Sequence, residues 1–244
     1  MFLTSSQYAQ DIFAAIFSVR KNGFFVEIGG YDPFKHSNSF WLESRRGWGG
    51  VCVEPDPLKA KKIENNRDAT VINKAISTER RPLDFVVAGA LSAIVETLPV
   101  EHFERIKREI PDWEIISVEC VPFTEIDNVV PNGKIDFLTV DVEGHEVEVL
   151  KSIDFERVNI STMTIEYGVS NSDEIRLIME RAGFCLLFTH HADYFFVNKA
   201  VLNEMAWGKV FFKKILLMFA FLINDVALVM NRVSRVVGKV SAKE

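Results

Sequence analysis

The stretch Phe24-Phe25-Val26-Glu27-Ile28-Gly29-Gly30 is a short apolar run that ends in two glycines. This pattern predicts a buried parallel strand that breaks into a tight turn. A second short apolar run, Val51-Cys52-Val53-Glu54, ends in a carboxylate 25 positions after Gly29. A glycine turn after one strand and an acidic residue at the tip of the next form the layout of a Rossmann-like nucleotide site. Each half alone also occurs in an ordinary α/β core without a ligand.

The glycine loop favours one nucleotide over the others. A dinucleotide site has the pattern G-x-G-x-x-G, which seats a pyrophosphate on a helix N-terminus. Here Gly29 is followed by Gly30-Tyr31-Asp32-Pro33-Phe34-Lys35, with neither a third glycine nor a Walker lysine. Glu27 and Asp32 would repel phosphates. Acidic groups suit a ligand with a positive centre and an amino group, so the loop predicts S-adenosylmethionine and not NAD.

Composition sets the broad class. A chain of 244 residues suits one domain with a substantial core. Its net charge of −6 argues against a nucleic-acid binder. The three cysteines are far apart, which indicates buried thiols in a reducing compartment and neither a disulfide frame nor a zinc site. The first residues lack the pattern of a signal peptide, so we expect a cytoplasmic protein.

Strand-like and helix-like runs alternate along the chain. The strand-like runs are 24–28, 51–54, 70–72 with 75–76 as its end, 81–88, 115–121, 135–141, 163–166, and the pair 184–188 and 194–197. The helix-like runs are 7–19, one through 40–42, one after Pro55-Asp56-Pro57, 101–110, one from about 146, and 173–182. This alternation predicts an α/β fold with a doubly wound, mostly parallel sheet and an antiparallel edge hairpin. Residues 80–120 are the hardest to interpret.

The C-terminal tail differs from the rest of the chain. Residues 211–223 are nearly all apolar, Asn224-Asp225 interrupts the run, and Lys213, Lys214, Arg232, Arg235, Lys239 and Lys243 lie in it or beside it. We divide the chain into a domain at 1–200 and a hydrophobic and basic helical tail at 201–244. A helix in a membrane interface or docked on a partner, including a second copy, fits this pattern best. A core helix and a membrane span are the alternatives.

Several blocks in order resemble the FkbM family of S-adenosylmethionine-dependent methyltransferases, over about residues 6–199. The blocks are Ser6-Gln7-Tyr8-Ala9-Gln10-Asp11, Phe24 to Gly29, His36-Ser37-Asn38, Gly47 to Pro55, Asn73-Lys74-Ala75-Ile76-Ser77 and Asp141-Val142-Glu143-Gly144-His145-Glu146. The resemblance implies a class I methyltransferase fold and methyl transfer, usually to a hydroxyl of a sugar or natural product. The family commonly has Asp-Gly where this chain has Asp32-Pro33, and often alanine at the position of Gly30.

The cofactor-binding residues predicted from these patterns lie at successive strand ends. Glu54 is expected to accept the ribose hydroxyls, and its alternative role is a charge at a helix N-terminus. Glu27, Gly29 and Asp32 would frame the methionine end, and Ala75-Ile76 would lie beside the adenine. The full predicted set is Glu27, Gly29, Gly30, Asp32, Ser37, Asn38, Glu54, Pro55, Ala75, Ile76 and Asp141.

The predicted catalytic residues are Asp141, Glu143 and His145, at the carboxyl end of a strand, where open α/β sheets bind ligands. O-methylation benefits from a base for the acceptor hydroxyl, and His145 has a suitable intrinsic pKa. Asp141 or Glu143 would orient it or the substrate. The same carboxylates with Glu166 form an alternative divalent-metal site, which we do not favour. His190-His191 are expected in a solvated loop and not as ligands.

The sequence therefore predicts an S-adenosylmethionine-dependent methyltransferase that O-methylates a glycan or related hydroxyl. The competing hypothesis is a non-catalytic binding or scaffold protein that kept the fold and associates with a membrane or partner through its tail. The altered loop at Pro33 favours the second hypothesis. Glu54 and the Asp141–Glu143 cluster favour the enzyme. A tail bound to lipid would place the protein at the inner face of a membrane.

Overall fold

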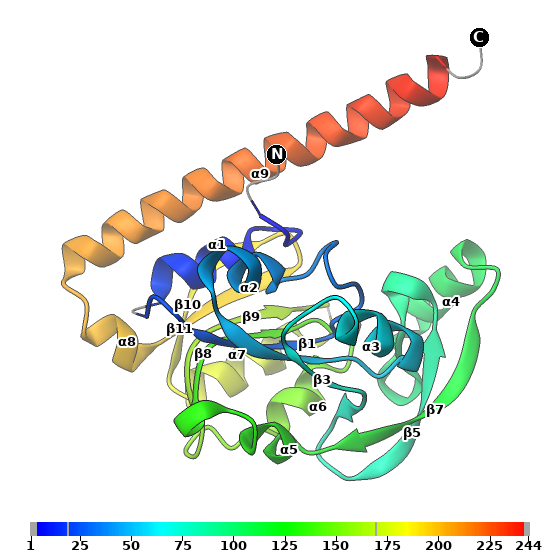
Figure 1. Cartoon of the computed structure of the whole chain (residues 1–244), viewed down its shortest axis with the longest axis horizontal. Coiled ribbons are helices and arrows are strands. Elements are labelled where there is room, and N and C mark those ends of the chain that lie inside the picture. The colour runs from blue at the N-terminus through cyan, green and yellow to red at the C-terminus, as the bar shows by residue number, and fades with distance from the viewer. Residues whose placement is uncertain (1–3, 19, 169, 242–244) are drawn as a thin grey trace.

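A seven-stranded sheet forms the centre of the molecule (Figure 1). The computed structural model describes residues 4–18, 20–168 and 170–241, with side chains as far as Met230. The strand order is β10-β11-β9-β8-β1-β2-β3. The strands are β1 (Phe24–Ile28), β2 (Gly49–Val53), β3 (Thr70–Ile72), β8 (Lys134–Val140), β9 (Asn159–Glu166), β10 (Phe184–His190) and β11 (Asp193–Asn198). β11 is antiparallel to both neighbours, and the other pairs are parallel. The predicted class I methyltransferase fold with an antiparallel edge hairpin is confirmed.

Helices cover both faces of this sheet, because its central strands are apolar on both sides. Side chains alternate along β1, so Val26 and Ile28 enter one core and Phe25 enters the other. The first core is covered by α5 (Thr124–Asp127), α6 (Glu146–Lys151) and α7 (Ser172–Arg181). The second is covered by α1 (Gln10–Phe17), α2 (Phe40–Arg46), α3 (Pro57–Glu64) and the tail. Glu27 points into this second side, where its carboxylate meets the polar side chains of Ser37 and Ser39.

The stretch that was hardest to interpret forms a separate four-stranded sheet of order β4-β7-β5-β6. Its elements are β4 (Ala75–Ile76), β5 (Arg81–Val87), β6 (Ala93–Ile94), α4 (Val100–Glu109) and β7 (Glu114–Val121). Two short 3-10 turns, η1 (Gly89–Leu91) and η2 (Val95–Thr97), connect them, and a third, η3 (Pro131–Gly133), precedes β8. The expectation that residues 75–76 end the third strand is wrong, because the chain leaves the main sheet at Asn73. The Asn73 amide fixes that exit by donating to the Glu54 and Pro55 carbonyls at 2.9 Å each.

The first helix is shorter than the expected 7–19. α1 begins at Gln10, because Ala9 lies in the left-handed region with φ 62°. The carboxylate of Asp11 accepts hydrogen bonds from the Ser5 backbone amide at 3.0 Å and the Ser6 hydroxyl at 2.8 Å. Residues before α1 are thus held as a loop. The end of the expected helix, residue 19, lies outside the described residues.

The tail consists of α8 (Lys199–Asn203) and the long α9 (Trp207–Ser241), which lies over α1 and extends past the body (Figure 1). Leu217 and Phe221 are buried and join the second core. Phe221 contacts Phe195 of β11 and Phe188 of β10, with ring centroids 5.1 and 5.6 Å apart. Within the described residues, no helix has the length and apolar character needed to cross a membrane. The division of the chain at residue 200 stays a prediction.

Candidate functional site

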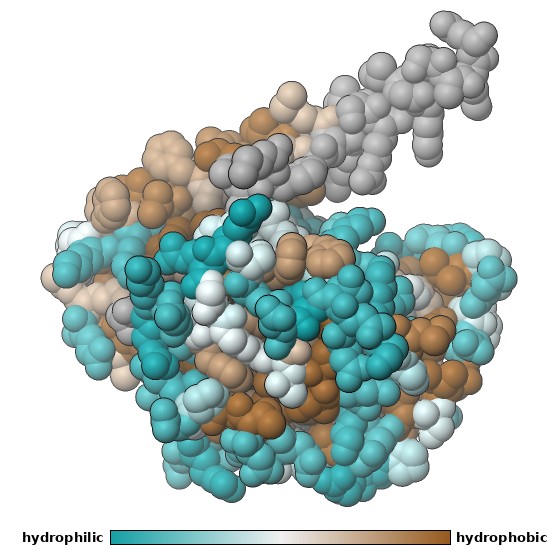
Figure 2. All heavy atoms as spheres, in the orientation of Figure 1, coloured by the Kyte–Doolittle hydropathy of each residue, from teal (hydrophilic) through white to brown (hydrophobic). Residues whose placement is uncertain are grey.

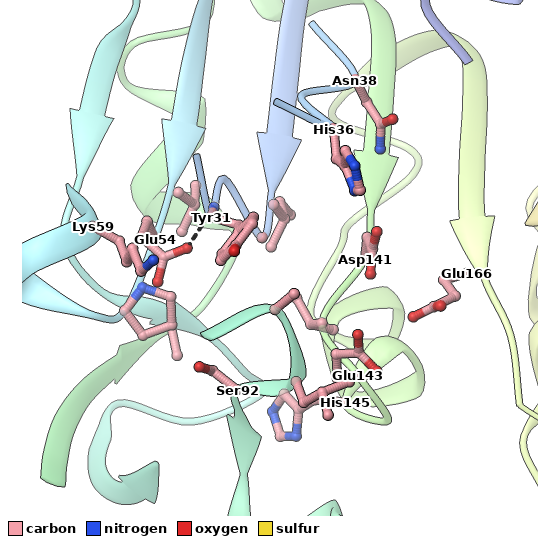
Figure 3. Close-up of a pocket in the computed structure, with 18 of the residues that line it drawn as sticks. Tyr31, His36, Asn38, Glu54, Lys59, Ser92, Asp141, Glu143, His145 and Glu166 are labelled. Atoms are coloured by element: carbon pink, nitrogen blue, oxygen red, sulfur yellow. Dashed lines mark hydrogen bonds between the residues drawn. The ribbon is translucent and has the colours of Figure 1, made fainter. Parts of the chain in front are cut away.

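A cavity of about 440 Å³ opens at the carboxyl ends of the strands, between the main sheet and the small sheet. Figure 3 shows side chains pointing into it from the ends of β1, β2, β8 and β9. Nine of the residues predicted from sequence line it. They are Gly29, Asn38, Glu54, Pro55, Ala75, Ile76, Asp141, Glu143 and His145. The other four predicted residues, Glu27, Gly30, Asp32 and Ser37, support the lining from outside it.

The three strand ends around Gly29 are in backbone contact. A Cβ on Gly29 would lie 1.8 Å from the Asp141 carbonyl oxygen, and its φ is +96°, so only glycine fits. The amides of Gly29 and Gly30 both donate to the Val53 carbonyl, at 3.0 and 3.1 Å. Gly30 packs closely against the Ile63 side chain, which leaves no room for a Cβ at this position of the loop. The turn therefore fixes the ends of β1, β2 and β8 relative to one another.

Glu54 follows β2 and is oriented by backbone amides. Its two carboxylate oxygens accept hydrogen bonds from the Tyr31 and Asp56 amides, each at 2.8 Å. Burial raises the pKa of Glu54 to about 7, although these two amides oppose the rise. Each oxygen keeps a further lone pair. The carboxylate can thus accept hydroxyl hydrogens from a ligand in the cavity.

Tyr31 and Lys59 line the same end of the cavity, and the sequence reasoning missed both. Tyr31 has φ 43°, a conformation that side chains rarely adopt. The Lys59 ammonium lies 4.4 Å from the centre of its ring (Figure 3). Tyr31 directly follows the two glycines, and Lys59 lies shortly after Glu54, in the first turns of α3. This closeness in sequence to the glycine turn and to Glu54 was the available signal.

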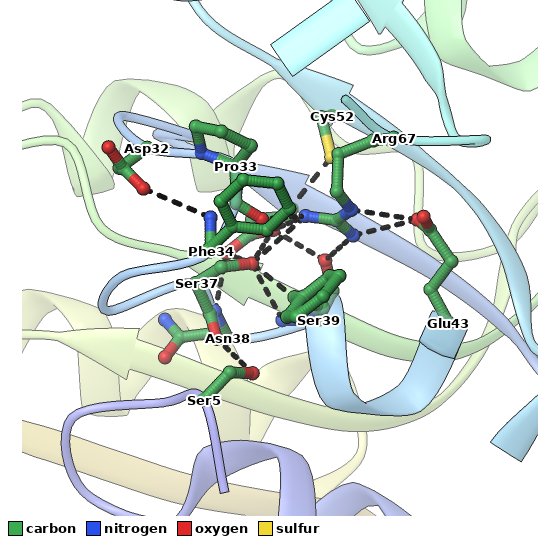
Figure 4. Close-up of polar contacts among 12 residues, drawn as sticks. Ser5, Asp32, Pro33, Phe34, Ser37, Asn38, Ser39, Glu43, Cys52 and Arg67 are labelled. Atoms are coloured by element: carbon green, nitrogen blue, oxygen red, sulfur yellow. Dashed lines mark hydrogen bonds and ion pairs between the residues drawn. The ribbon is translucent and has the colours of Figure 1, made fainter. Parts of the chain in front are cut away.

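Glu27 is buried and belongs to a polar network behind the cavity. Figure 4 shows the part of this network that Ser37, Ser39 and Arg67 form. Its carboxylate accepts from the Ser39 hydroxyl at 2.5 Å, the Asn38 amide at 2.5 Å and the Ser37 hydroxyl at 3.0 Å. Arg67 lies 3.9 Å from it. Burial raises the pKa of Glu27, and Arg67 opposes the rise. Glu27 therefore holds the loop that carries His36 and Asn38 into the cavity.

Arg67 joins that loop to α2. It donates to Glu43 from Nε and Nη2, at 2.9 and 2.8 Å, and from Nη1 to the Pro33 carbonyl at 3.2 Å. The proline that departs from the family pattern is thus anchored through its carbonyl. Asp32 accepts from the Phe34 and Lys35 amides and pairs with Lys62 at 2.6 Å, on the outer side of the loop. Partial burial acts to raise the pKa of Asp32, but these hydrogen bonds outweigh it and lower the pKa to about 2.

Three carboxylates meet on the opposite side of the cavity. Acceptor atoms of Asp141, Glu143 and Glu166 all lie within 4.8 Å of one another. Burial raises the pKa of Asp141. Burial and then repulsion by Asp141 raise the pKa of Glu143 to about 8, and the same two causes raise that of Glu166 further. Such a cluster is stabilised by protons or by a cationic ligand. Asp193, whose pKa burial raises to about 8, adds a fourth acidic side chain nearby.

The loop from Val142 to His145 presents two of the predicted catalytic residues. Glu143 has φ 54° and Gly144 has φ 108°. Glu146 braces the loop, because its Oε1 accepts from the Gly144 amide at 2.9 Å and its Oε2 from Asn171 at 2.8 Å. Glu146 is itself buried, so it acts as a structural group at the start of α6.

His145 is buried at the cavity wall. Its Nδ1 lies 2.9 Å from the Thr97 hydroxyl, and its Nε2 is buried without a hydrogen-bond partner among the described residues. Burial lowers the pKa of His145, so the ring is neutral near pH 7. When Nδ1 donates to Thr97, Nε2 carries the free lone pair. His102 of α4 lies 3.5 Å from Glu143 Oε2 and ties the small sheet to the acidic cluster.

Besides the predicted Ala75 and Ile76, further residues from the region of the small sheet close the cavity, and sequence reasoning missed them. Ser92 and Leu91 come from the turn before β6, and Arg105 comes from α4. Their stretch carries no strong pattern, so composition gave no signal. Gln7, Tyr8 and Gln10 enter from the other side. They belong to the first block of the family resemblance, which was the signal that could have found them.

A second group of metal-ligand types lies at the rim. One ligand atom from each of His190, His191 and Asp225 lies within 4.8 Å of the other two. The expected solvated loop is partly packed instead. His191 stacks on Tyr8 with ring centroids 4.3 Å apart, and His190 stacks on Phe221 at 4.1 Å.

Comparison with known proteins identifies the family of this chain. A profile described as the methyltransferase FkbM domain matches residues 27–186. Comparison with curated proteins gives no significant match. Among solved structures, precorrin-6y C5,15-methyltransferase from Geobacter metallireducens shares 10% identity, with a TM-score of 0.40 over 80% of this chain and 89% of that one. M. capricolum TrmK in complex with S-adenosyl-homocysteine shares 10% identity, with a TM-score of 0.39 over 80% and 68%. Similarities this low carry no argument about function.

Proposed function

The chain belongs to the methyltransferase FkbM family, and from that premise we propose that it transfers a methyl group to a hydroxyl oxygen of a sugar, glycan or natural product in the cytoplasm. S-adenosylmethionine is the cofactor, as the family resemblance implies. The observation that carries the choice of oxygen as acceptor is the buried, unpartnered Nε2 of His145 at the cavity wall.

The chemistry of the cavity fits this cofactor. Glu54 offers two oxygens, already oriented by amides, for the ribose hydroxyls. Ala75 and Ile76 are small or apolar and suit the adenine. Asp141 and Glu143 have raised pKa values, so a positive ligand favours their ionised forms. When bound, S-adenosylmethionine supplies an electrophilic methyl group on a sulfonium, which a nucleophilic oxygen accepts as the carbon–sulfur bond breaks.

His145 would act as the base in this proposal. A hydroxyl becomes a stronger nucleophile as its proton leaves, and a neutral imidazole accepts that proton at Nε2 while Nδ1–H donates to Thr97. Glu143 and Asp141 would orient the acceptor hydroxyl and balance the positive charge. His102 would keep Glu143 in place, since it lies 3.5 Å from its carboxylate. The walls from the small sheet would exclude water from the reacting atoms.

The proposal is tested by radiolabelled methyl transfer to a panel of sugar and natural-product hydroxyls. Removing a positioned base costs about 100-fold or more in turnover, while ground-state binding changes little. We therefore expect His145→Ala and Glu143→Gln to lower turnover by about that factor without weakening S-adenosylhomocysteine binding. Glu174→Gln, an exposed carboxylate on α7 that pairs with Lys151, is the matched control.

Two outcomes would contradict the proposal. Methylation by both variants at the parental rate would make Glu143 and His145 structural. Binding of S-adenosylhomocysteine with methylation of an amine or carbon and no hydroxyl in the panel would refute O-methylation. The scaffold alternative predicts no transfer at all, and the anchored Pro33 carbonyl weakens the reason for preferring it.

A further inference from the structure

α9 is amphipathic with its apolar side turned away from the protein. Between Phe211 and Met230, all eleven exposed positions carry large apolar side chains. Examples are Phe212, Ile215, Phe219, Leu222, Val226 and Met230, which are 36–67% exposed. Figure 2 shows these apolar residues along α9, above the body. A helix that covers a water-soluble domain normally shows the reverse pattern.

The polar residues of the same stretch face the body. Lys213 lies over the Phe17 ring at 5.5 Å, and Lys214 lies over the Phe188 ring at 6.0 Å. The Asn224 amide donates to the Gln7 carbonyl at 2.8 Å. Asp225 pairs with His191 at 3.0 Å. These contacts, together with buried Leu217 and Phe221, fix the rotation of α9 about its axis. The apolar side is therefore presented outward by specific interactions.

The outward side is continuous over the described side chains. The stretch from Phe211 to Met230 spans about 30 Å at the rise of an α-helix. A contiguous apolar surface of this kind on a soluble protein marks a site that binds lipid or another protein. Trp207 is 81% exposed and stacks on Phe211 at the start of the helix. Exposed tryptophan is typical of the membrane interface.

Charge decides between lipid and a second copy. Residues 205–244 contain five lysines and arginines besides the body-facing Lys213 and Lys214, against two acidic residues, although the whole chain has a net charge of −6. Pairing two such tails would bring like charges together, whereas an anionic lipid surface attracts them. We propose that α9 lies in the surface of an anionic membrane, with its outward side among the acyl chains and the protein body on the aqueous side. This proposal is independent of the reaction that the protein catalyses.

Flotation of the full-length protein with vesicles tests the proposal, because aggregated protein sinks and bound protein rises. The vesicles contain either phosphatidylcholine alone or phosphatidylcholine with about a third phosphatidylglycerol. We expect flotation with the anionic vesicles that weakens as salt rises from 50 to 500 mM. Phe219→Glu combined with Leu222→Glu should reduce binding about tenfold or more. Leu177→Glu on α7, on the opposite face of the sheet, is the matched control and should bind like the parent.

Two results would overturn the proposal. The first is no flotation of the parent with either vesicle. The second is equal flotation of the parent and the Phe219/Leu222 double variant when circular dichroism shows that both are folded. Analytical ultracentrifugation identifies the competing occupant. A dimer that the double variant abolishes, without lipid binding by the parent, would assign the outward side to a second copy and refute the membrane surface.

Discussion

Replacing Glu54 should weaken cofactor binding and change stability in a separable way. In Glu54→Ala, the carboxylate acceptor for the ribose hydroxyls is lost, and so are the acceptors for the Tyr31 and Asp56 amides. A hydrogen bond to a charged group contributes about 1.5–3 kcal/mol. At about 2 kcal/mol, S-adenosylhomocysteine should bind about 30-fold more weakly. The two unpaired amides also lower the stability of the ligand-free protein.

The two effects differ in a thermal-shift assay. Ligand at 100 times the parental Kd stabilises the parent by about 2.7 kcal/mol, and a variant with 30-fold weaker binding by about 0.9 kcal/mol. For a chain of this size, these values correspond to Tm gains of about 5–11 °C and 2–4 °C. The lower starting Tm of the variant reports the stability effect alone. Asn73 still donates to the Glu54 backbone carbonyl, so the strand end is retained.

The pH dependence gives an independent check, because the pKa of Glu54 is about 7. A carboxyl with a raised pKa in the folded state contributes stability at low pH that is lost as pH rises through 7. The ligand needs the ionised form, so affinity should change in the opposite direction and rise between pH 6 and 8. The reasoning is refuted if parent and Glu54→Ala gain the same Tm from the ligand. A parent that gains none would refute the whole cofactor site.

Three further predictions follow from the site. Arg67→Met leaves the buried Glu27 and the partly buried Glu43 without their cation, so urea unfolding should show a loss of about 3–5 kcal/mol. The loss should be smaller at pH 5 than at pH 8, since burial raises the pKa of Glu27 and its protonation removes the unpaired charge; equal losses would contradict this account. Gly29→Ala places a Cβ 1.8 Å from the Asp141 carbonyl, so we expect at least about 3 kcal/mol lower stability, and a parental unfolding midpoint would show that the contact relaxes. EDTA should leave methyl transfer unchanged if Glu143 and Asp141 balance the cofactor alone, whereas a loss restored by Mg²⁺ would assign the cluster to a metal.

The main sheet could be predicted because its strands are short apolar runs with distinct ends. Gly29, Glu54 and Asp141 were found from their positions at those ends, since parallel strands meet at one edge. The contacts of the Glu27 side chain could not be predicted in the same way. Alternation along β1 places it on the face opposite Val26, but only the three-dimensional position of Arg67 shows what it contacts.

The small sheet and the orientation of α9 lay beyond the reach of sequence patterns. Ala75-Ile76 looks like the continuation of β3, and only the Asn73 side chain, bonded to the Glu54 and Pro55 carbonyls, turns the chain away. The composition of the tail indicated an amphipathic helix. It did not show that Lys213 and Lys214 face inward, because a helical pattern fixes which residues share a side and not which side meets the body.

If α9 binds lipid as proposed, its contacts with the cavity rim would link lipid binding and cofactor binding energetically. Asn224 and Asp225 bond to Gln7 and His191, and Gln7 itself lines the cavity. A shift of α9 on its support therefore moves part of the cavity wall. If vesicles change the affinity for S-adenosylhomocysteine by some factor, the nucleoside must change the affinity for vesicles by the same factor. Membrane attachment at this position would thus regulate the enzyme allosterically as well as localise it.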